Sequence, residues 1–329
     1  MRTRLALACS ALAAVVLAAT VSDQWSDHPV PVTAGSGPAT AVRPVARSSP
    51  GQPPATAECT PQNLLASLRP QGPLPAPGQM PAGSTMASIA KRGYLTVGVL
   101  EDTYPIAFLN QNSRMLEGFD IDIAWDIAEA IFGDRERVLF RPLHEADRFT
   151  TVESGQVDLT VAVATITCAL REKLDFSAVY YQTGQRVLVT RGSAITGLDG
   201  LRGKRVCVAR GSTSLRHILA APAKPIAVGA ATQTDCLMLL QLGAVDAVST
   251  DDTLLAGMAE QDPQTEVVGP KFSEEPYGVA INKNTPDLVR FVNAVLQRRA
   301  EDGRWRASYE RWLAPLGPAP APPTPQYRD

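Results

Sequence analysis

The stretch GFDIDIAWDIAEAI, residues 118–131, has the apolar spacing of an amphipathic helix and decides how the chain around it folds. Phe119, Ile123, Ile127 and Ile131 recur every four residues, so they share one face of a helix. The compact apolar segment YLTVGVL at 94–100 precedes this helix and is typical of a buried strand. A further strand is predicted after it, over Arg137–Pro142. A strand, a helix and a strand in succession indicate an α/β lobe.

The same alternation continues along the chain in two sets. The first set ends with a helix over Ala146–Ser154 and a strand over Asp158–Thr165. The second set has strands at 185–190, 205–209, 226–228 and 244–249 and helices at 214–220 and 234–242, and a strand at 277–281 and a helix at 286–301 follow. Strands interleaved with helices predict α/β lobes with largely parallel sheets.

Extended segments at about 183–188 and 272–280 join the two sets. They predict two lobes with two crossover hinges and a cleft that captures a ligand by hinge closure. The expected organisation is a Pro/Ala-rich tether at 23–85, lobe 1 at 86–184, lobe 2 at 185–276, a return to lobe 1 at 277–316, and a Pro-rich tail at 317–329. The tether and tail contain few large apolar residues, so neither can form a core.

The first 22 residues predict export. A positively charged start, Met1–Arg4, precedes an apolar run from Leu5 to Val21 and polar residues from Ser22. Two alternatives stay open, because a run of about 17 residues is at the lower limit for a membrane span. Residues 1–22 are either a signal peptide or a short uncleaved anchor, with a buried N-terminal helix as the less favoured reading. The expected location is the extracytoplasmic cell envelope.

Composition argues against several classes of function. A net charge of −2 gives no basic footprint, so nucleic acid is not an expected partner. The three histidines lie far apart, and no His/Cys pair has metal-ligand spacing, so neither a metal nor a cofactor is predicted. The chain also lacks a Gly-x-x-x-x-Gly-Lys-Ser/Thr motif, so any ATP hydrolysis would occur on another chain. A monomer is expected.

Four cysteines remain once Cys9 is set aside with the N-terminal run, an even number in an oxidising compartment. Three pairings are open. We favour Cys207 with Cys236, because both fall within one βαβ-like stretch, which leaves Cys59 with Cys168. The second bridge would staple the tether to the folded body. Buried free thiols are the alternative.

Several motifs in order resemble a known family, the polar-amino-acid-binding proteins of bacterial ABC importers, called family 3 solute-binding proteins. The similarity covers roughly Met86 to Leu316 and includes LEGFDIDIAWDIAEAIFG, VDLTVAVATIT, REKLDFSAVYYQTGQ, LRGKRVCVARGSTS and GAVDAVSTDDTLLAG. It is strongest toward actinobacterial glutamate/glutamine-binding proteins, which share the contexts of three of the cysteines and the Pro-rich tail. The resemblance implies a periplasmic-binding-protein type II fold and a receptor without enzymatic activity.

The second lobe offers partners for both charged ends of an amino acid. Asp251 follows a strand at its carboxyl end, where open α/β sheets bind ligands, and the resemblance implies that it binds the α-ammonium group. Its alternative role is an N-cap, for which Asp252 is better placed. Ser212 and Thr213 precede a helix and could hold a carboxylate with backbone N–H groups. Arg210 would contact an acidic ligand side chain.

The first lobe is expected to contribute fewer contacts. The resemblance places ligand-facing side chains at Asp102, Tyr104 and Phe108, although isolated aromatic residues are more often core. Thr165 occupies the position at which the family binds the α-carboxylate.

One departure from the family pattern affects the carboxylate site. The family has a carboxylate-binding arginine five residues after the threonine, and here that position is Leu170, with Arg171 one residue later. One residue turns a helix by about 100°, so Arg171 either still reaches the ligand or forms a surface ion pair. Ala162, Val163 and Ala164 offer no obvious replacement. The missing arginine predicts a weaker or a different ligand unless Arg171 compensates.

Three functions follow from these expectations. The leading one is a receptor that captures Glu, Asp, Gln or Asn and delivers it to the membrane subunits of an ABC importer. The second is a sensor on the same fold that reports ligand occupancy to a membrane receptor. The third is an exported dehydratase-like enzyme with Asp251 and Asp102 as acid or base, although no His or Cys constellation accompanies them.

Overall fold

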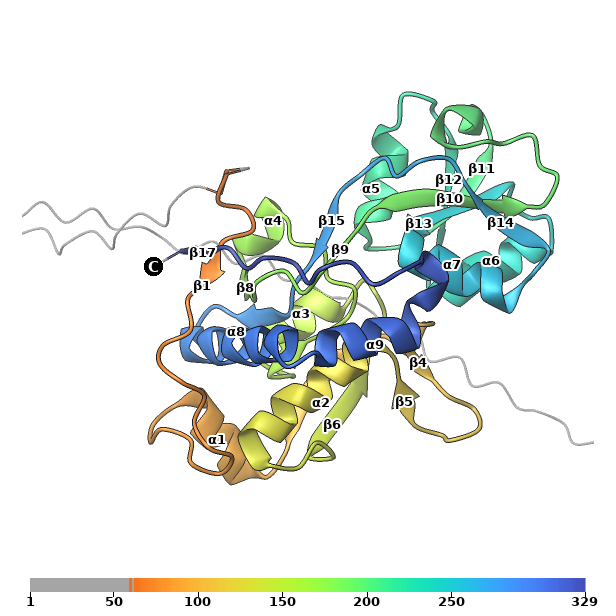
Figure 1. Ribbon diagram of the computed structural model, residues 1–329. Coiled ribbons are helices and arrows are strands. Elements are labelled where there is room, and N and C mark those ends of the chain that lie inside the picture. The colour runs from red at the N-terminus through yellow and green to blue at the C-terminus, as the bar shows by residue number, and fades with distance from the viewer. Residues whose placement is uncertain (1–58, 61, 329) are drawn as a thin grey trace, which may run out of the picture. The chain divides into compact units, whose positions relative to one another are not determined.

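The computed structural model describes residues 59, 60 and 62–328 (Figure 1). They belong to one compact unit, residues 56–329. The predicted signal peptide or anchor, and the tether as far as residue 58, lie outside the described residues. In the part of the chain that the structure describes, no helix is both long and apolar enough to cross a membrane.

Most predicted helices and strands are present within a few residues of their expected bounds, but the predicted strand at 158–165 is reduced to Leu159–Thr160, and the one at 277–281 is divided into two short strands. The helices are α1 (Thr85–Arg92), α2 (Phe119–Phe132), α3 (Arg148–Glu153), α4 (Cys168–Arg171), α5 (Thr213–Ala220), α6 (Gln233–Gln241), α7 (Asp252–Gln261), α8 (Pro286–Glu301) and α9 (Arg304–Trp312), with 3₁₀ turns η1 (Leu198–Leu201) and η2 (Ala314–Leu316). The strands are β1 (Ser67–Leu68), β2 (Leu95–Val99), β3 (Asp102–Thr103), β4 (Ala107–Leu109), β5 (Leu116–Glu117), β6 (Val138–Pro142), β7 (Leu159–Thr160), β8 (Leu174–Phe176), β9 (Tyr181–Thr183), β10 (Gln185–Thr190), β11 (Arg205–Ala209), β12 (Ile226–Ala230), β13 (Ala247–Asp251), β14 (Thr265–Val268), β15 (Glu275–Tyr277), β16 (Ala280–Asn282) and β17 (Tyr327–Arg328).

The first lobe is built on the sheet β6-β2-β7-β16-β8, and the predicted helix at 118–131 is α2. Phe119, Ile123 and Ile127 of α2 are fully buried in the largest apolar cluster of the described chain. Gly118 precedes α2 with φ 132°, and a Cβ there would lie 2.3 Å from the Ile106 carbonyl oxygen. Only glycine therefore allows α2 to start this close to the segment before β4.

The second lobe is built on the sheet β12-β11-β13-β10-β14. The Cys207–Cys236 bridge, with Cα atoms 5.4 Å apart, joins β11 to α6 as predicted. The expectation of largely parallel sheets is wrong, because each sheet contains antiparallel as well as parallel strand pairs. β10 pairs antiparallel with β13 and β14, and β16 pairs antiparallel with β7 and β8. β10 and β16 each follow directly after a crossover between the lobes. Each of them therefore runs opposite to the parallel strands of the sheet that it joins.

Two short crossover strands, β9 and β15, pair antiparallel with each other between the lobes. β9 ends where the first predicted hinge segment begins, and β15 lies within the second. Tyr181 of β9 and Tyr277 of β15 pack with ring centroids 6.0 Å apart, and Trp305 of α9 stacks on Tyr181 at 6.5 Å. The crossover strands therefore pack on the first lobe through these three aromatic rings.

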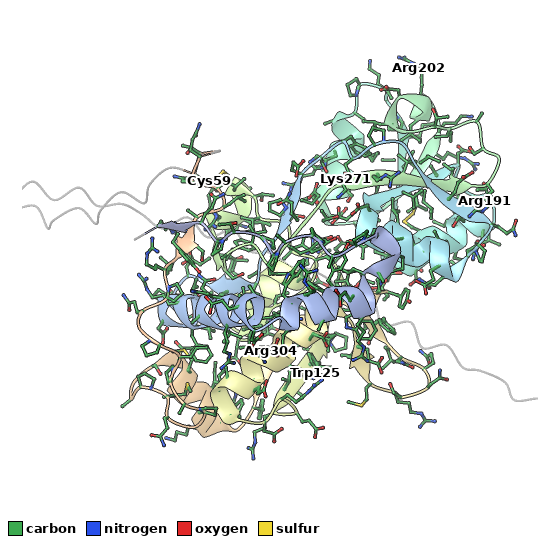
Figure 2. All side chains as sticks on the ribbon, in the orientation of Figure 1. Cys59, Trp125, Arg191, Arg202, Lys271 and Arg304 are labelled. Atoms are coloured by element: carbon green, nitrogen blue, oxygen red, sulfur yellow. A yellow bond between two sulfur atoms is a disulfide. The ribbon has the colours of Figure 1, made fainter. Side chains whose placement is uncertain are left out.

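Residues 62–84 differ from an extended tether because they are docked on the first lobe. The Ser67 hydroxyl donates to the Phe176 carbonyl oxygen at 2.7 Å, and β1 pairs in parallel with β17 of the tail. The predicted Cys59–Cys168 bridge is present and ties this segment to α4 (Figure 2). Leu64 and Leu65 pack against a buried apolar cluster that includes Phe176. The tail does lie over the first lobe, and its Arg328 pairs with Asp175 at 2.7 Å.

Asp120 of α2 couples the stability of the first lobe to pH. Its carboxylate accepts hydrogen bonds from the Val163 amide at 2.9 Å and the Tyr180 hydroxyl at 2.8 Å, but complete burial raises its pKa to about 7. The folded protein therefore holds this proton more tightly than the unfolded chain. The resulting stabilisation is fully present below the unfolded pKa of 3.8 and is lost as pH rises through about 7.

We expect Asp120→Asn to flatten this dependence. Between about pH 4 and pH 7, the free energy of unfolding of the wild type should fall relative to that of the variant by up to about 1.4 kcal/mol per pH unit. Urea denaturation of both proteins across this range measures the difference. Parallel pH profiles would show that Asp120 is not the titrating group.

Candidate functional site

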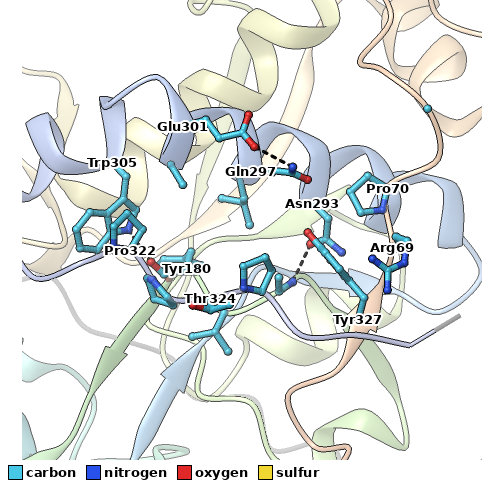
Figure 3. Close-up of a pocket in the computed structure, with 17 residues that line it drawn as sticks. Arg69, Pro70, Tyr180, Asn293, Gln297, Glu301, Trp305, Pro322, Thr324 and Tyr327 are labelled. Atoms are coloured by element: carbon cyan, nitrogen blue, oxygen red, sulfur yellow. Dashed lines mark hydrogen bonds between the residues drawn. The ribbon is translucent and has the colours of Figure 1, made fainter.

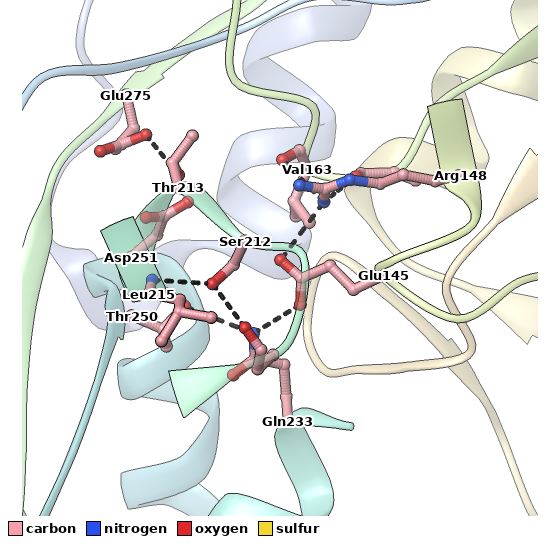
Figure 4. A network of polar contacts seen from close by, with 12 residues as sticks. Glu145, Arg148, Val163, Ser212, Thr213, Leu215, Gln233, Thr250, Asp251 and Glu275 are labelled. Atoms are coloured by element: carbon pink, nitrogen blue, oxygen red, sulfur yellow. Dashed lines mark hydrogen bonds and ion pairs between the residues drawn. The ribbon is translucent and has the colours of Figure 1, made fainter. Parts of the chain in front are cut away.

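A buried group of polar side chains lies where loops of both lobes and a crossover strand meet (Figure 4). We call it the central polar cluster, and it consists of Glu145, Arg148, Thr213, Gln233, Asp251, Glu275 and Tyr277. Most of these residues follow the carboxyl ends of parallel strands or start the helices after them. In open α/β sheets that edge is where ligands bind.

The cluster joins the two lobes directly. The Gln233 side-chain amide of α6 donates to the Glu145 carboxylate at 2.9 Å, and Glu145 lies 3.5 Å from an Arg148 Nη1 atom. Close backbone approach accompanies this contact, since a Cβ at Gly211 would lie 2.6 Å from the Ala146 Cα. The lobes are therefore closed around the cluster.

Asp251 ends β13 and is 5% exposed. The Tyr277 hydroxyl donates to its Oδ2 atom, whereas Oδ1 is buried and has no hydrogen-bond partner. Burial, and next the negative charge of Glu275, raise the pKa of Asp251 well above its usual range. A bound cation would stabilise the ionised form of this carboxylate.

Arg148 starts α3, is 2% exposed, and is the arginine of the cluster. Its Nη1 atom donates to the carbonyl oxygens of Ala162 at 2.9 Å and Val163 at 3.3 Å, and its Nε atom is buried without a partner. Val163 has φ 45°, a left-handed conformation that is unfavourable for a β-branched residue. Such strained residues gather at binding sites, where the surrounding structure holds them in place.

Three buried polar atoms of the cluster thus lack partners: Asp251 Oδ1, Arg148 Nε and Gln233 Oε1. An unpaired buried polar group costs about 1–3 kcal/mol. The three atoms belong to a carboxyl group, a guanidinium group and a neutral amide. An amino acid carries an ammonium group, a carboxylate and a side chain, and these match the three groups in chemical type.

Two predicted ligand residues belong to the cluster and two border it. Asp251 and Thr213 are members, and the Thr213 hydroxyl donates to Glu275 at 2.9 Å. Ser212 accepts the Leu215 amide at 3.0 Å, so its hydroxyl acts as the N-cap of α5. Thr165 is buried and bridges to Tyr277. Asp251, and not Asp252, occupies the N-cap position of α7, but its side chain makes no capping hydrogen bond, and Asp252 pairs with Lys271 at 2.9 Å.

The two predicted arginine contacts, Arg171 and Arg210, lie outside the central polar cluster. Arg171 donates from Nε to the Leu64 carbonyl oxygen at 2.5 Å and packs over Phe176, so the docked N-terminal segment holds it away from the cluster. Arg210 is exposed and donates to the Gly229 carbonyl oxygen of the edge strand β12 at 2.6 Å. Leu170 of α4 packs against a buried apolar cluster that includes Phe176.

The remaining first-lobe residues lie around a separate groove. Asp102 lines this groove, and its carboxylate accepts hydrogen bonds from the backbone amides of Gln233 at 3.0 Å and Thr234 at 3.4 Å. Tyr104 donates to Glu260 at 3.0 Å, and Phe108 packs edge-on against Tyr104 and Trp312. The structure does not bring these three side chains together with Asp251.

Sequence reasoning missed Glu145, Arg148, Gln233 and Glu275. Arg148 and Gln233 lie at the starts of predicted helices that follow predicted strands. This position at the edge of a sheet is the one feature of the sequence that could have marked them as site residues. Glu275 lies in the predicted second crossover. None of the four has a local pattern that separates it from a charged surface residue.

A large cavity of about 690 Å³ lies elsewhere, under the Pro-rich tail (Figure 3). Tyr180, Trp305, Pro322 and Tyr327 line it, and no residue of the central polar cluster does. The Trp305 indole already donates to the Tyr180 carbonyl oxygen at 2.8 Å. Because this cavity offers no buried carboxylate and arginine together, the central polar cluster is the better candidate for an amino-acid site.

Comparisons with known proteins agree with the two-lobed architecture. The family described as bacterial extracellular solute-binding proteins, family 3, matches residues 95–315. The chain is 34% identical over 230 residues to the ABC transporter glutamine-binding protein GlnH of Bacillus subtilis, covering 70% of this chain and 84% of that protein. It is 29% identical over 259 residues to the glutamate-binding protein GluB of Corynebacterium efficiens, covering 73% and 84%. The crystal structure of the ancestral amino acid-binding protein AncCDT-1, a precursor of cyclohexadienyl dehydratase, superposes with a TM-score of 0.64 at 31% identity, covering 70% and 99%.

Proposed function

The chain belongs to the bacterial extracellular solute-binding proteins of family 3, and on that premise we propose that it captures a polar amino acid, namely Glu, Asp, Gln or Asn, outside the cytoplasm by closure of its lobes. The observation that carries the proposal is the set of three unpartnered buried atoms on Asp251, Arg148 and Gln233. The relatives named for glutamine and glutamate support the choice of ligand class.

Each end of the ligand has a proposed partner. The α-ammonium group binds Asp251 Oδ1, and the α-carboxylate binds Arg148, which takes over from the arginine that Leu170 replaces. The ligand side chain then faces Gln233, whose free oxygen accepts from an amide. Glu145 and Glu275 already supply two carboxyl groups within the cluster, which favours an amide side chain of the ligand over a further carboxylate.

Isothermal titration calorimetry with the common amino acids tests the proposal. We expect saturable, micromolar binding of at least one of the four candidates and none of apolar amino acids. If no polar amino acid gives a heat of binding, the proposed receptor function is wrong.

We propose that the protein delivers its ligand to the membrane subunits of an ABC importer. The name of the Bacillus subtilis relative, ABC transporter glutamine-binding protein GlnH, supports this. The alternative is a sensor that reports occupancy to a membrane receptor. Neighbouring genes separate the two, because permease and ATPase genes favour transport and an adjacent receptor gene favours sensing.

An enzymatic function is the second candidate, and two observations favour testing it. AncCDT-1 is a precursor of a dehydratase, and the pKa values of Asp251 and Glu145 are both raised by burial, as required of a general acid. Incubation with prephenate, followed by detection of the dehydrated product, decides the matter. We expect no turnover.

Lobe closure depends on Gly257 of α7. A Cβ at this position would lie 2.0 Å from the Tyr104 carbonyl oxygen on the opposite lobe. We expect Gly257→Ala to hold the lobes apart and to weaken amino-acid binding by about tenfold or more, which corresponds to about 1.4 kcal/mol of lost closure energy. Calorimetry measures the affinity and small-angle scattering measures the increase in radius of gyration.

Gly200→Ala is the matched control, because a Cβ there would meet Ile195 at an ordinary 3.4 Å. It should leave affinity and radius unchanged. If Gly257→Ala also leaves both unchanged, the closed arrangement does not contribute to ligand capture.

A further inference from the structure

The cavity of about 690 Å³ under the Pro-rich tail lies apart from the central polar cluster and has no role in the proposed amino-acid site. We call it the tail cavity. Three parts of the first lobe line it together with residues 322–327 of the tail, namely residues 69–72, residues 178–180, and the helices α8 and α9 (Figure 3). A volume of this size is typical of sites for small organic molecules.

The tail is fixed at both ends of the stretch that covers this cavity. Leu316 and Ala319 pack against the largest apolar cluster, and the Ser67 amide of β1 donates to the Gln326 carbonyl oxygen at 2.9 Å. Between these two anchors, residues 320–325 form no backbone hydrogen bond within the described part of the chain. Four of these six residues are proline and have no N–H group to donate. The tail therefore spans the surface of α8 between its anchors, and the tail cavity is the space that it leaves.

The lining of the tail cavity is mostly apolar. Trp305 and Tyr327 lie toward opposite ends of it in Figure 3. Helix α8 and the tail add aliphatic and proline side chains, which are Leu296, Ala300, Pro322, Pro323 and Pro325. Its two charged residues, Arg69 and Glu301, have opposite signs, so the lining favours neither an anion nor a cation. Apolar walls with aromatic rings suit a flat, uncharged ring.

Most polar side chains of the lining are already paired. Asn293 accepts the Ala178 amide at 2.7 Å, and the Gln297 amide donates to Glu301 at 2.9 Å. The buried exception is Tyr327, whose hydroxyl oxygen has no hydrogen-bond partner in the described chain. A hydroxyl group on a ligand beside the Tyr327 ring supplies this partner, whereas an entirely apolar molecule does not.

We propose that the tail cavity binds a small uncharged aromatic molecule that carries a hydroxyl group, with its ring between α8 and the prolines of the tail and its hydroxyl paired with Tyr327. This ligand differs in class from the amino acid proposed for the central polar cluster. The two sites share no residue, so both ligands can be bound at the same time.

Equilibrium dialysis of 2-naphthol against the full chain at neutral pH tests the proposal. We expect saturable binding of one molecule per chain. Ala300→Phe places a phenyl ring in the cavity and should abolish this binding. Ala294→Phe is the matched control, because Ala294 is also a half-buried residue of α8 but lines a different pocket. It should stay within about twofold of wild type, and thermal unfolding shows whether both variants are folded.

Tyr327→Phe tests the polar contact. It should weaken binding of 2-naphthol about fivefold, which corresponds to the loss of one neutral hydrogen bond, and leave binding of naphthalene unchanged. An equal effect on the two compounds would refute the pairing of the ligand hydroxyl with Tyr327.

Two results would overturn the site itself. One is the absence of saturable binding by the wild type, and the other is equal binding by the Ala300→Phe and Ala294→Phe variants. Asp251→Asn distinguishes this site from the amino-acid site, since it should bind 2-naphthol as the wild type does. Weaker binding by Asp251→Asn would place the compound in the central polar cluster and contradict the proposal.

Discussion

Arg148→Lys should weaken amino-acid binding by about ten- to hundredfold, the loss expected when a charge-assisted hydrogen bond worth about 1.5–3 kcal/mol is removed. Lysine keeps the positive charge that faces Glu145, which lies 3.5 Å from Arg148. It lacks the Nε–H donor and the planar fork that pair with a carboxylate. The free energy of unfolding should therefore change less than the affinity does.

Arg171→Lys is the control for this experiment. Arg171 donates to the backbone of Leu64, and burial lowers its pKa to about 10, so it contributes to docking of the N-terminal segment. We expect its affinity for amino acids to stay within about twofold of wild type. Calorimetry measures both variants, and thermal unfolding confirms that both are folded. Normal binding by Arg148→Lys with impaired binding by Arg171→Lys would reverse the assignment and restore the original expectation.

Asp251→Asn should reduce affinity by more than about hundredfold, because the α-ammonium group loses a buried charged partner. The Tyr277 hydroxyl still has an acceptor at residue 251, so the fold should persist. Asp252→Asn is the matched neighbour, since Asp252 bonds Thr183 and Lys271 outside the cluster. Its affinity should remain within about fivefold of wild type.

The same aspartate predicts how affinity depends on pH. Burial and Glu275 raise the pKa of Asp251 in the free protein, whereas a bound ammonium group lowers it by favouring the ionised form. Ligand binding therefore releases a proton, and affinity should rise with pH until the free protein is itself ionised. Titrations in buffers of different ionisation enthalpy measure the proton released. A wild-type affinity that falls with rising pH would contradict this role for Asp251.

The predicted fold is confirmed: an α/β, two-lobed periplasmic-binding-protein type II fold in a family 3 solute-binding protein. Local pattern was sufficient for α2, α6 and α8, because buried residues at helical spacing specify a helix wherever it packs. Local pattern was also sufficient to predict that Asp251 lies at the edge of the sheet, since it follows directly on a run of buried strand residues. The departure at Leu170 was equally visible in the sequence.

The tertiary structure alone decided which arginine the central polar cluster contains. Arg148 lies 22 positions before Leu170 and reaches the cluster only because α3 packs behind the Ala162–Val163 backbone, whose carbonyl oxygens hold its guanidinium group. Arg171, the nearer candidate in sequence, is drawn off by Leu64, which lies 107 residues away. The periodicity of apolar residues predicts which face of a helix or strand is buried, but it does not predict which distant segment packs against that face. The sequence therefore determined the lobes and the position of Asp251 at the end of a buried strand, and long-range packing determined which arginine lies in the central polar cluster.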